Sequence, residues 1–319
     1  MELLTILGLF IISFALLWVG SGLAVGAITK ISHSLRMSSF FVSFFVMGLF
    51  TSLTEIMVGI NAVISNQPEI FVGNLIGSSI VMFMLVVPLL AVLGNGVNLN
   101  YSFKFKDLVT AALVVGIPAL LTIDNRITLV DVLICLVLYG YFAFIQEKNN
   151  RSLSKLVAIN FSRSTIYISL AKILVAIVLV FFASSILVKQ TTILANYFGA
   201  SPFIISILVI SVGTNIPELS IAVRAVLAKK KDIAFGNYLG SATLNTLELG
   251  LLGLISTKPI PALGSNFSIA VFLVGLVLFL YFAKSRKTIS RVEGSVLILI
   301  YFLFVAFEIF TGPGWTLQK

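Results

Sequence analysis

Ten long apolar segments make up most of this 319-residue chain. Each is close to the length of about 20 residues that an α-helix needs to cross the hydrocarbon core of a bilayer. Within that core every backbone polar group must be hydrogen-bonded inside the protein, which leaves helices as the structure of such long segments. We therefore predict an all-α polytopic membrane protein with ten transmembrane helices, at roughly 3–27, 39–65, 70–94, 106–122, 128–146, 164–188, 202–228, 233–256, 266–283 and 293–311.

The composition supports this class and excludes several others. The chain is 59% hydrophobic and 10% charged, against about 25% charged residues in an ordinary soluble domain. The net charge of +9 falls in short loops between apolar segments, so we expect no nucleic-acid partner. Single Cys and His residues, Cys135 and His33, leave no cluster for zinc or iron. The apolar segments also lack the paired Asp or His–Glu motif of an intramembrane enzyme, so we expect neither enzyme activity nor a cofactor.

The basic residues divide unequally between the two sides of this topology. Fifteen Lys and Arg fall in loops on one side and four on the other, while Lys172 and Arg224 lie inside predicted helices. The side that is richer in Lys and Arg faces the cytoplasm in most membrane proteins. We therefore expect both termini to be extracytoplasmic, in a protein of the cell membrane.

The chain also repeats itself. The longest polar stretch divides it into a first five-helix repeat at 1–147, a cytoplasmic linker at 148–163 and a second five-helix repeat at 164–319. Because five is odd, the second repeat must enter the membrane in the opposite direction, which predicts two inverted repeats. Segments 40–82 and 203–245 align without a gap at an offset of 163, with 12 of 43 positions identical.

This repeat matches two glutamates, Glu55 and Glu218, each near the middle of an apolar segment. A carboxylate at that depth costs several kcal/mol unless it meets a cation or faces water. Hydroxyl, amide and carboxylate oxygens suit hard cations such as sodium and calcium. We expect Gly48, Gly213 and Pro217 to loosen these helices and free carbonyl oxygens. The candidate ligands, for which hydrogen bonding between helices is the alternative, are Glu55, Glu218, Thr51, Ser52, Thr214, Asn215, Ser78 and Ser241.

Two motifs carry a resemblance to a known family. Gly213-Thr214-Asn215-Ile216-Pro217-Glu218 and the twice-occurring Gly-Asn-x-x-Gly-Ser, in two inverted halves, resemble the sodium/calcium exchangers of the calcium/cation antiporter superfamily. The resemblance implies a central site on the second, third, seventh and eighth helices. There the two glutamates would bind calcium or sodium in alternation while the protein moves between inward-open and outward-open states. Its partners would be these inorganic cations and the lipid bilayer.

Four residues depart from the family pattern, namely Phe50, Thr54, Met82 and Asn245. The family usually has Gly and Pro at the first two positions, commonly Asn at the third and Asp at the fourth. Calcium affinity falls with fewer charged ligands, so the transported ion and the stoichiometry stay open. Asn245 stays a candidate ligand. Glu248 lies on the same helix face as Ser241 and Asn245 and is a candidate replacement ligand, vestibule carboxylate or proton acceptor, with pairing to a polar group of a neighbouring helix as the alternative.

Three hypotheses follow. The first is an antiporter that exchanges calcium for sodium. The second is a proton-coupled or monovalent cation exchanger, because buried carboxyl groups can carry protons. The third is a transport-dead homologue, a hypothesis that rests on the departures from the family pattern at Phe50 and Met82. None of the motifs bears on the oligomeric state.

The charge asymmetry predicts the orientation. A cysteine introduced at either end, as Glu2→Cys or Lys319→Cys, should react with a membrane-impermeant maleimide in intact cells, because both termini would face outwards. Protection of both positions until the cells are lysed would reverse the assigned orientation.

Overall fold

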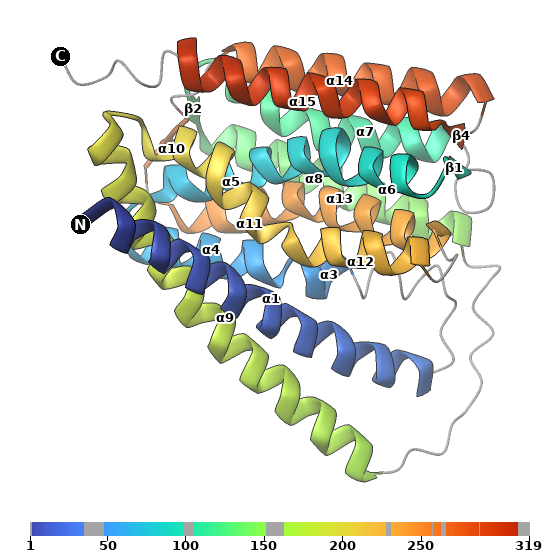
Figure 1. The fold of residues 1–319 in the computed structure, drawn as a ribbon, viewed down its shortest axis with the longest axis horizontal. Coiled ribbons are helices and arrows are strands. Elements are labelled where there is room, and N and C mark those ends of the chain that lie inside the picture. The colour runs from blue at the N-terminus through green and yellow to red at the C-terminus, as the bar shows by residue number, and fades with distance from the viewer. Residues whose placement is uncertain are drawn as a thin grey trace.

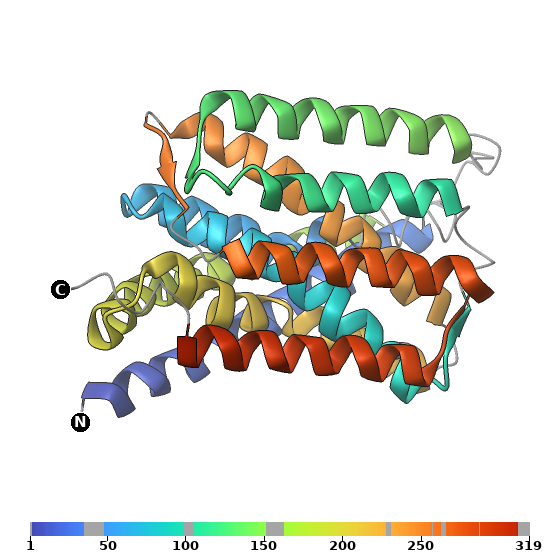
Figure 2. The same cartoon turned by 90° about the horizontal axis from the view of Figure 1, so that it is seen from above.

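A computed structural model describes residues 2–34, 48–98, 105–150, 163–227, 231–256, 258–262, 266–286 and 288–311. Within these ranges the chain is helical apart from turns and two-residue strands. Most helices run along one common direction and form an elongated bundle (Figures 1 and 2), while the two long helices at 2–34 and 163–198 are inclined to it in Figure 1. The predicted linker at 148–163 lies mostly outside the described residues, as do Met1 and 312–319.

Every predicted span contains helix. The first half consists of α1 (Glu2–Ser34), α3 (Gly48–Thr51), α4 (Leu53–Ile64), α5 (Pro68–Val81), the π-helix η2 (Met82–Val86), α6 (Val87–Leu93), α7 (Phe105–Leu120) and α8 (Leu129–Asn150). The second half consists of α9 (Arg163–Phe198), α10 (Pro202–Ile205), the π-helix η4 (Ser206–Ile210), α11 (Ser211–Thr214), α12 (Ile216–Leu227), α13 (Lys231–Ile255), α14 (Asn266–Arg286) and α15 (Arg291–Thr311). Seven helical segments of the described chain are long and apolar enough to cross a membrane. The all-helical membrane fold is thus confirmed.

Burial separates an inner group of helices from an outer one. Most residues of Pro68–Leu93 and of Pro202–Leu219 are buried. The membrane spans of α1, α8, α9, α14 and α15 instead bury fewer than half of their residues, as helices in contact with lipid acyl chains do. Helices α1 and α9 pack against each other along one side of the bundle (Figure 1).

Two small antiparallel sheets join the halves at opposite ends of the bundle (Figure 1). Strand β1 (Val97–Asn98) pairs with β4 (Thr288–Ile289), and β2 (Arg126–Ile127) pairs with β3 (Ile260–Pro261). Each sheet therefore takes one strand from each half. Strands β1 and β3 begin 163 residues apart, at the offset of the sequence repeat, yet they lie at opposite ends. In an inverted repeat, counterpart segments of the two halves lie at opposite ends in this way.

Glycines let helices from opposite halves approach closely. A Cβ at Gly77 of α5 would lie 2.8 Å from the Cα and the carbonyl oxygen of Ile207, and 2.8 Å from the Ser211 side chain. A Cβ at Gly48 of α3 would lie 3.2 Å from the carbonyl carbon of Gly240 in α13. Gly48 and Ser211, like Gly77 and Gly240, are related by the repeat offset. The same close crossing is therefore built twice.

This crossing predicts a sensitive position. Gly77→Ala should destabilise the protein by about 1–3 kcal/mol, because the new methyl group would overlap backbone atoms that cannot rotate away. Thermal unfolding of the purified protein in detergent measures the loss. Gly140→Ala in α8 is the matched control, since nothing lies within 4 Å of its Cβ position. Equal melting temperatures for the two variants would contradict the tight crossing.

Candidate functional site

The two helices that carry the matched glutamates are both interrupted just before the carboxyl group. Helix α3 ends at Thr51 and α4 begins after Ser52, while α11 ends at Thr214 and α12 begins after Asn215. Ser52 and Asn215 have nearly the same conformation, with φ −70° and ψ 1° against φ −87° and ψ 6°. Because the last carbonyl groups of a helix lack intrahelical partners, each interruption frees carbonyl oxygens next to a glutamate.

The interruptions do not fall on the glycines that we expected to loosen these helices. Gly213 lies within α11, and a Cβ there would fall 1.9 Å from the ring of Phe14 in α1. Gly48 is the first residue of α3 and packs against α13. Their physical role is close packing. The backbone opens instead at Ser52 and Asn215.

Glu55 and Glu218 lie in the first turns of α4 and α12 and are 1% and 0% exposed. The Ser78 hydroxyl of α5 donates to Glu55 Oε1 at 3.2 Å, and the Ser241 hydroxyl of α13 donates to Glu218 Oε1 at 3.2 Å. Each glutamate thus receives a hydrogen bond from its own half, over the same sequence distance. The two glutamates are also linked across the halves, because the Thr54 hydroxyl bonds to Glu55 Oε2 and lies 3.2 Å from the carbonyl oxygen of Thr214, four residues before Glu218.

The same serines also reach the opposite half. Ser241 shares a hydrogen bond of 2.9 Å with Ser52, and Ser78 accepts one of 2.7 Å from the Asn215 side chain. Ser52 and Asn215 are the two interruption residues, one in each repeat. Each interruption is therefore tied to the serine that holds the glutamate of the other half.

The two threonines before the interruptions complete this pattern. The Thr51 hydroxyl donates to Ser241 at 3.4 Å, and the Thr214 hydroxyl donates to Asn74 Oδ1 at 3.2 Å. The structure thus brings together eight of the predicted site residues, all buried: Glu55, Glu218, Thr51, Ser52, Thr214, Asn215, Ser78 and Ser241. The Asn237 side chain, the counterpart of Asn74, lies outside the described part.

Thr54, which the sequence marks only as a departure from the family pattern, has a central place in the structure. Its hydroxyl lies 2.5 Å from Glu55 Oε2, 3.2 Å from the Thr51 carbonyl oxygen and 3.2 Å from the Thr214 carbonyl oxygen. It therefore links the hydrogen bonds around one glutamate to the interruptions of both halves. The available signal was a hydroxyl group at a position where the other half has Pro217.

Within the described part of the chain, the site contains no compensating positive charge. The described residues do contain an ion pair, but it joins the exposed Arg126 and Asp124, which are not site residues. Lys172 lies exposed on α9, and the Arg224 side chain lies outside the described residues. Glu218 Oε2 and Asn215 Oδ1 are buried without a hydrogen-bond partner among the described atoms. Each unsatisfied buried polar atom costs about 1–3 kcal/mol.

The other two candidates, Asn245 and Glu248, face differently. The Asn245 side chain donates to the Leu75 carbonyl oxygen at 3.3 Å and to Ser79 at 3.2 Å, so its amide nitrogen is turned towards α5. It also lines a cavity of about 10 Å³ between α5, α7, α13 and α14. Met82, its counterpart, is buried in η2.

Glu248 is 4% exposed, and neither of its carboxyl oxygens has a hydrogen-bond partner among the described atoms. It lies seven residues, about two helical turns, beyond Ser241 on α13. No three His, Cys, Asp or Glu side chains in the described ranges lie close enough together to surround one metal ion. Glu248 therefore stands near the glutamate pair but does not join it around a common centre.

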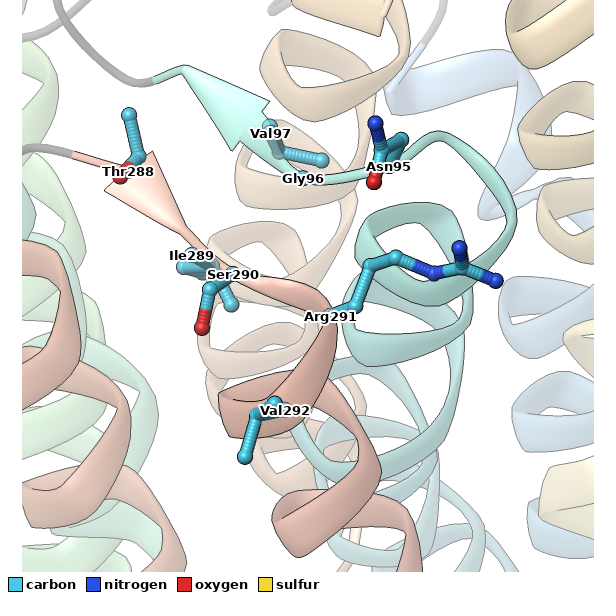
Figure 3. Close-up of a pocket in the computed structure, with 8 residues that line it drawn as sticks. All are labelled: Asn95, Gly96, Val97, Thr288, Ile289, Ser290, Arg291 and Val292. Carbon is cyan, nitrogen blue, oxygen red and sulfur yellow. The ribbon is translucent and has the colours of Figure 1, made fainter.

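A larger hollow lies elsewhere. It measures about 440 Å³ and is formed where β1 and β4 meet, at the end of the bundle opposite β2. Figure 3 shows the Arg291 side chain extending from the start of α15 and passing below Asn95. None of the predicted site residues lines this hollow. The candidate site residues are buried in the packed interior instead.

Comparison with known proteins agrees with this geometry. The sequence profile described as sodium/calcium exchanger protein matches residues 5–147 and 168–310. The putative antiporter CaxA of Alkalimonas amylolytica is 26% identical over 297 residues, which cover 90% of this chain and 92% of that protein. The sodium/calcium exchanger MaX1 of Methanosarcina acetivorans is 33% identical over 125 residues, 38% of this chain and 36% of that protein.

Two further similarities concern the membrane and the fold. The inner membrane protein YrbG of Escherichia coli K12 is 25% identical over 244 residues, which cover 73% of this chain and 75% of that protein. A solved structure of the sodium-calcium exchanger NCX_Mj superimposes with a TM-score of 0.68 at 25% identity, covering 95% of this chain and 98% of that one.

The direction of the Asn245 amide predicts the effect of the family residue. Asn245→Asp should lower the stability of the ion-free protein by about 1–3 kcal/mol, because it replaces a donor to the Leu75 carbonyl oxygen with a carboxylate. Added CaCl₂ should raise the melting temperature more in the variant than in the wild type, since the positive calcium ion would neutralise the added carboxylate. Identical melting curves in chelator would show that the amide does not bond to α5.

Proposed function

Because this chain belongs to the sodium/calcium exchanger protein family, we propose that it exchanges calcium for sodium by alternating access at a site between its two repeats. It is a cation antiporter of the membrane and not an enzyme. The names of CaxA, an antiporter, and MaX1, a sodium/calcium exchanger, support the choice of ions.

One observation carries the proposal. Glu55 and Glu218 are fully buried counterparts from two inverted repeats, and the hydrogen bonds to their side chains come from the neutral hydroxyls of Thr54, Ser78 and Ser241. Two carboxylates in such a place are costly without a counter-charge. One calcium ion supplies two positive charges, and sodium ions supply the same charge one at a time. Calcium and sodium would thus compete for the same pair.

The inverted halves supply the second requirement of exchange, which is access from either side in turn. When two repeats of opposite orientation surround one site, exchanging their conformations moves the opening from one membrane face to the other. Ser52 and Asn215, the residues at the helix interruptions, are hydrogen-bonded to serines of the opposite half. A movement of one half relative to the other would change these two hydrogen bonds directly. The proposed ligands are Glu55, Glu218, Thr51, Ser52, Ser78, Thr214, Asn215 and Ser241. Asn245 and Glu248 lie outside that group and are proposed as accessory ligands at its edge.

A proton-coupled or monovalent cation exchanger is the second candidate. Asn245 brings no charge to the site, which lowers the expected affinity for calcium. Glu248 is a third buried carboxyl group whose oxygens have no partner among the described atoms. A site with these two features could also couple transport to protons.

We further propose that both termini face away from the cytoplasm, in the cell membrane. The fifteen-to-four distribution of Lys and Arg supports this orientation. The start of α1 and the end of α15 lie at the same end of the bundle (Figures 1 and 2), as this topology requires. The similarity to an inner membrane protein supports the location.

Ion flux in proteoliposomes tests the function. Vesicles loaded with sodium should take up calcium when diluted into sodium-free buffer, and vesicles loaded with choline should not. Uptake driven by an imposed proton gradient in place of sodium would select the second candidate. Absence of flux under both gradients, with folded protein in the vesicles, would identify a transport-dead homologue.

The matched glutamates predict the effect of removing charge. Glu55→Gln and Glu218→Gln should each reduce calcium uptake more than ten-fold while leaving the protein folded, because the amide keeps the shape and removes the charge that a cation must meet. Size-exclusion chromatography checks folding. Glu69→Gln is the matched control, because Glu69 is only partly buried, in the first turn of α5. Wild-type uptake in either site variant would refute the assignment.

A further inference from the structure

The hollow of about 440 Å³ at the β1–β4 sheet takes no part in the proposed ion exchange. Residues 95–97 form one wall of this hollow, and residues 288–292 form the other (Figure 3). Its volume falls within the range of about 300–1,000 Å³ that is usual for pockets that bind small molecules. The two walls come from the two halves of the chain.

Both walls are fixed in place. Strand pairing joins Val97 to Ile289 across the hollow. Directly after the second wall, α15 packs closely on α6, where a Cβ at Gly294 would lie 2.8 Å from the carbonyl oxygen of Pro88. Such a close approach leaves little room for one helix to slide along the other. The hollow is therefore preformed, and a ligand would not have to open it.

The hollow lies where the membrane-spanning part of the chain begins. The span of α15 runs from Arg291 to Phe310, so its first residue lines the hollow, and the span of α14 ends just before, at Ser285. A position at the end of two spans is level with the headgroups of a bilayer. In the proposed orientation this is the cytoplasmic end, where most of the Lys and Arg residues lie.

Arg291 gives the hollow a positive charge. Its side chain is exposed and forms no ion pair with any residue that the structure describes. The carboxylate closest in sequence, Glu293, accepts hydrogen bonds from the backbone N–H and the hydroxyl of Ser290, at 2.7 and 2.8 Å. That carboxylate is thus engaged in capping α15, and the guanidinium of Arg291 is left for a ligand. Lys284, in the last turn of α14, is also exposed.

The other interstrand sheet shows the contrast. There Arg126, the first residue of β2, places its Nε 3.2 Å from the carboxylate of Asp124. Arg291 follows β4 by two residues, yet no described carboxylate pairs with it. Both sheets therefore have an exposed arginine beside a strand. The arginine at the proposed outer end is paired, and the one at the proposed cytoplasmic end is not.

An apolar stripe runs from the hollow along α15. Val292 lines the hollow and is exposed, and the exposed side chains that follow it at helical spacing are Val296, Leu299 and Leu303. Steps of four, three and four residues place these side chains on one face of the helix. The charged hollow is therefore continuous with a surface that suits acyl chains. A phospholipid would contact both parts, whereas a free phosphate ion would contact only the hollow.

We propose that this hollow binds the headgroup of an anionic phospholipid, with Arg291 on the phosphate and an acyl chain along the α15 stripe. A guanidinium group binds phosphate through two parallel hydrogen bonds. The side chains of Asn95 and Thr288 also line the hollow and offer polar groups to a headgroup such as glycerol. The inference is independent of which ions the protein exchanges.

The charge of the hollow selects among phospholipids. A zwitterionic headgroup such as phosphatidylcholine carries its own positive group, which Arg291 and Lys284 would repel. An anionic headgroup such as phosphatidylglycerol brings a net negative charge to a hollow whose arginine has no described carboxylate partner. Basic residues next to membrane spans attract anionic lipids for the same reason.

Native mass spectrometry tests the proposal on the purified full chain in detergent. Titration with dioleoyl phosphatidylglycerol and with dioleoyl phosphatidylcholine gives a dissociation constant for each lipid. We expect one phosphatidylglycerol to bind the wild type about ten-fold more tightly than phosphatidylcholine, and Arg291→Gln to remove that preference. Arg291→Lys should weaken phosphatidylglycerol binding about three-fold, because lysine keeps the charge and loses the two-pronged geometry. Arg126→Gln, at the opposite sheet, is the matched control and should bind as the wild type does.

Four results would overturn the proposal. Equal affinity of the wild type for the two lipids is the first, and unchanged phosphatidylglycerol binding in Arg291→Gln is the second. The third is an equal loss in Arg126→Gln, which would mean that only the overall charge matters. The fourth is displacement of phosphatidylglycerol by an equal concentration of potassium phosphate, which would make the hollow a site for the free ion. If Arg291→Gln does not fold, unchanged binding in Arg291→Lys overturns the proposal in its place.

Discussion

Two carboxyl groups buried in an apolar bundle are the constraint around which this structure is arranged. Glu55 and Glu218 are 1% and 0% exposed, and among the described residues their side chains are hydrogen-bonded to hydroxyl groups and to no basic residue. Hydroxyl groups orient a carboxylate without neutralising its charge. Packing and hydrogen bonds elsewhere in the protein must therefore offset the cost of two buried negative charges without a positive partner. The interrupted helices, the close glycine crossings and the oxygen-rich surroundings all serve that arrangement.

Symmetry explains how so short a chain builds such a site. Each repeat supplies a glutamate, an interrupted helix and a serine, and each serine contacts the glutamate of its own half and the interruption of the other. Ser78 reaches Asn215, and Ser241 reaches Ser52. Small differences between the halves then provide chemical variety, as Thr54 against Pro217 and Met82 against Asn245 show. The ligand set is therefore asymmetric although the scaffold is nearly symmetric.

Much of this could be predicted from the sequence, because lipid allows few backbone structures and makes intramembrane polar residues conspicuous. The spans, and the expectation that Ser78 reaches the same site as Glu55, follow from those rules. The positions of the helix interruptions do not, since glycine permits an interruption without requiring one, and Gly213 is used for packing against Phe14. The direction of Asn245 depends on acceptors in another helix, Leu75 and Ser79, which no local pattern reveals. The central place of Thr54 depends on a carbonyl group 160 residues away.

The pairing of strands across the halves has a consequence for biogenesis. Chains emerge from the ribosome N-terminus first, so β1 enters the membrane surface before its partner β4 has been translated. The same holds for Ser78, whose amide donor at Asn215 comes more than 130 residues later. The first repeat is therefore in the bilayer before the second repeat can cover Glu55. Strand β1 can be paired only when β4, directly before α15, has been translated, so closure of the bundle falls near the end of synthesis, after all the site residues have been made.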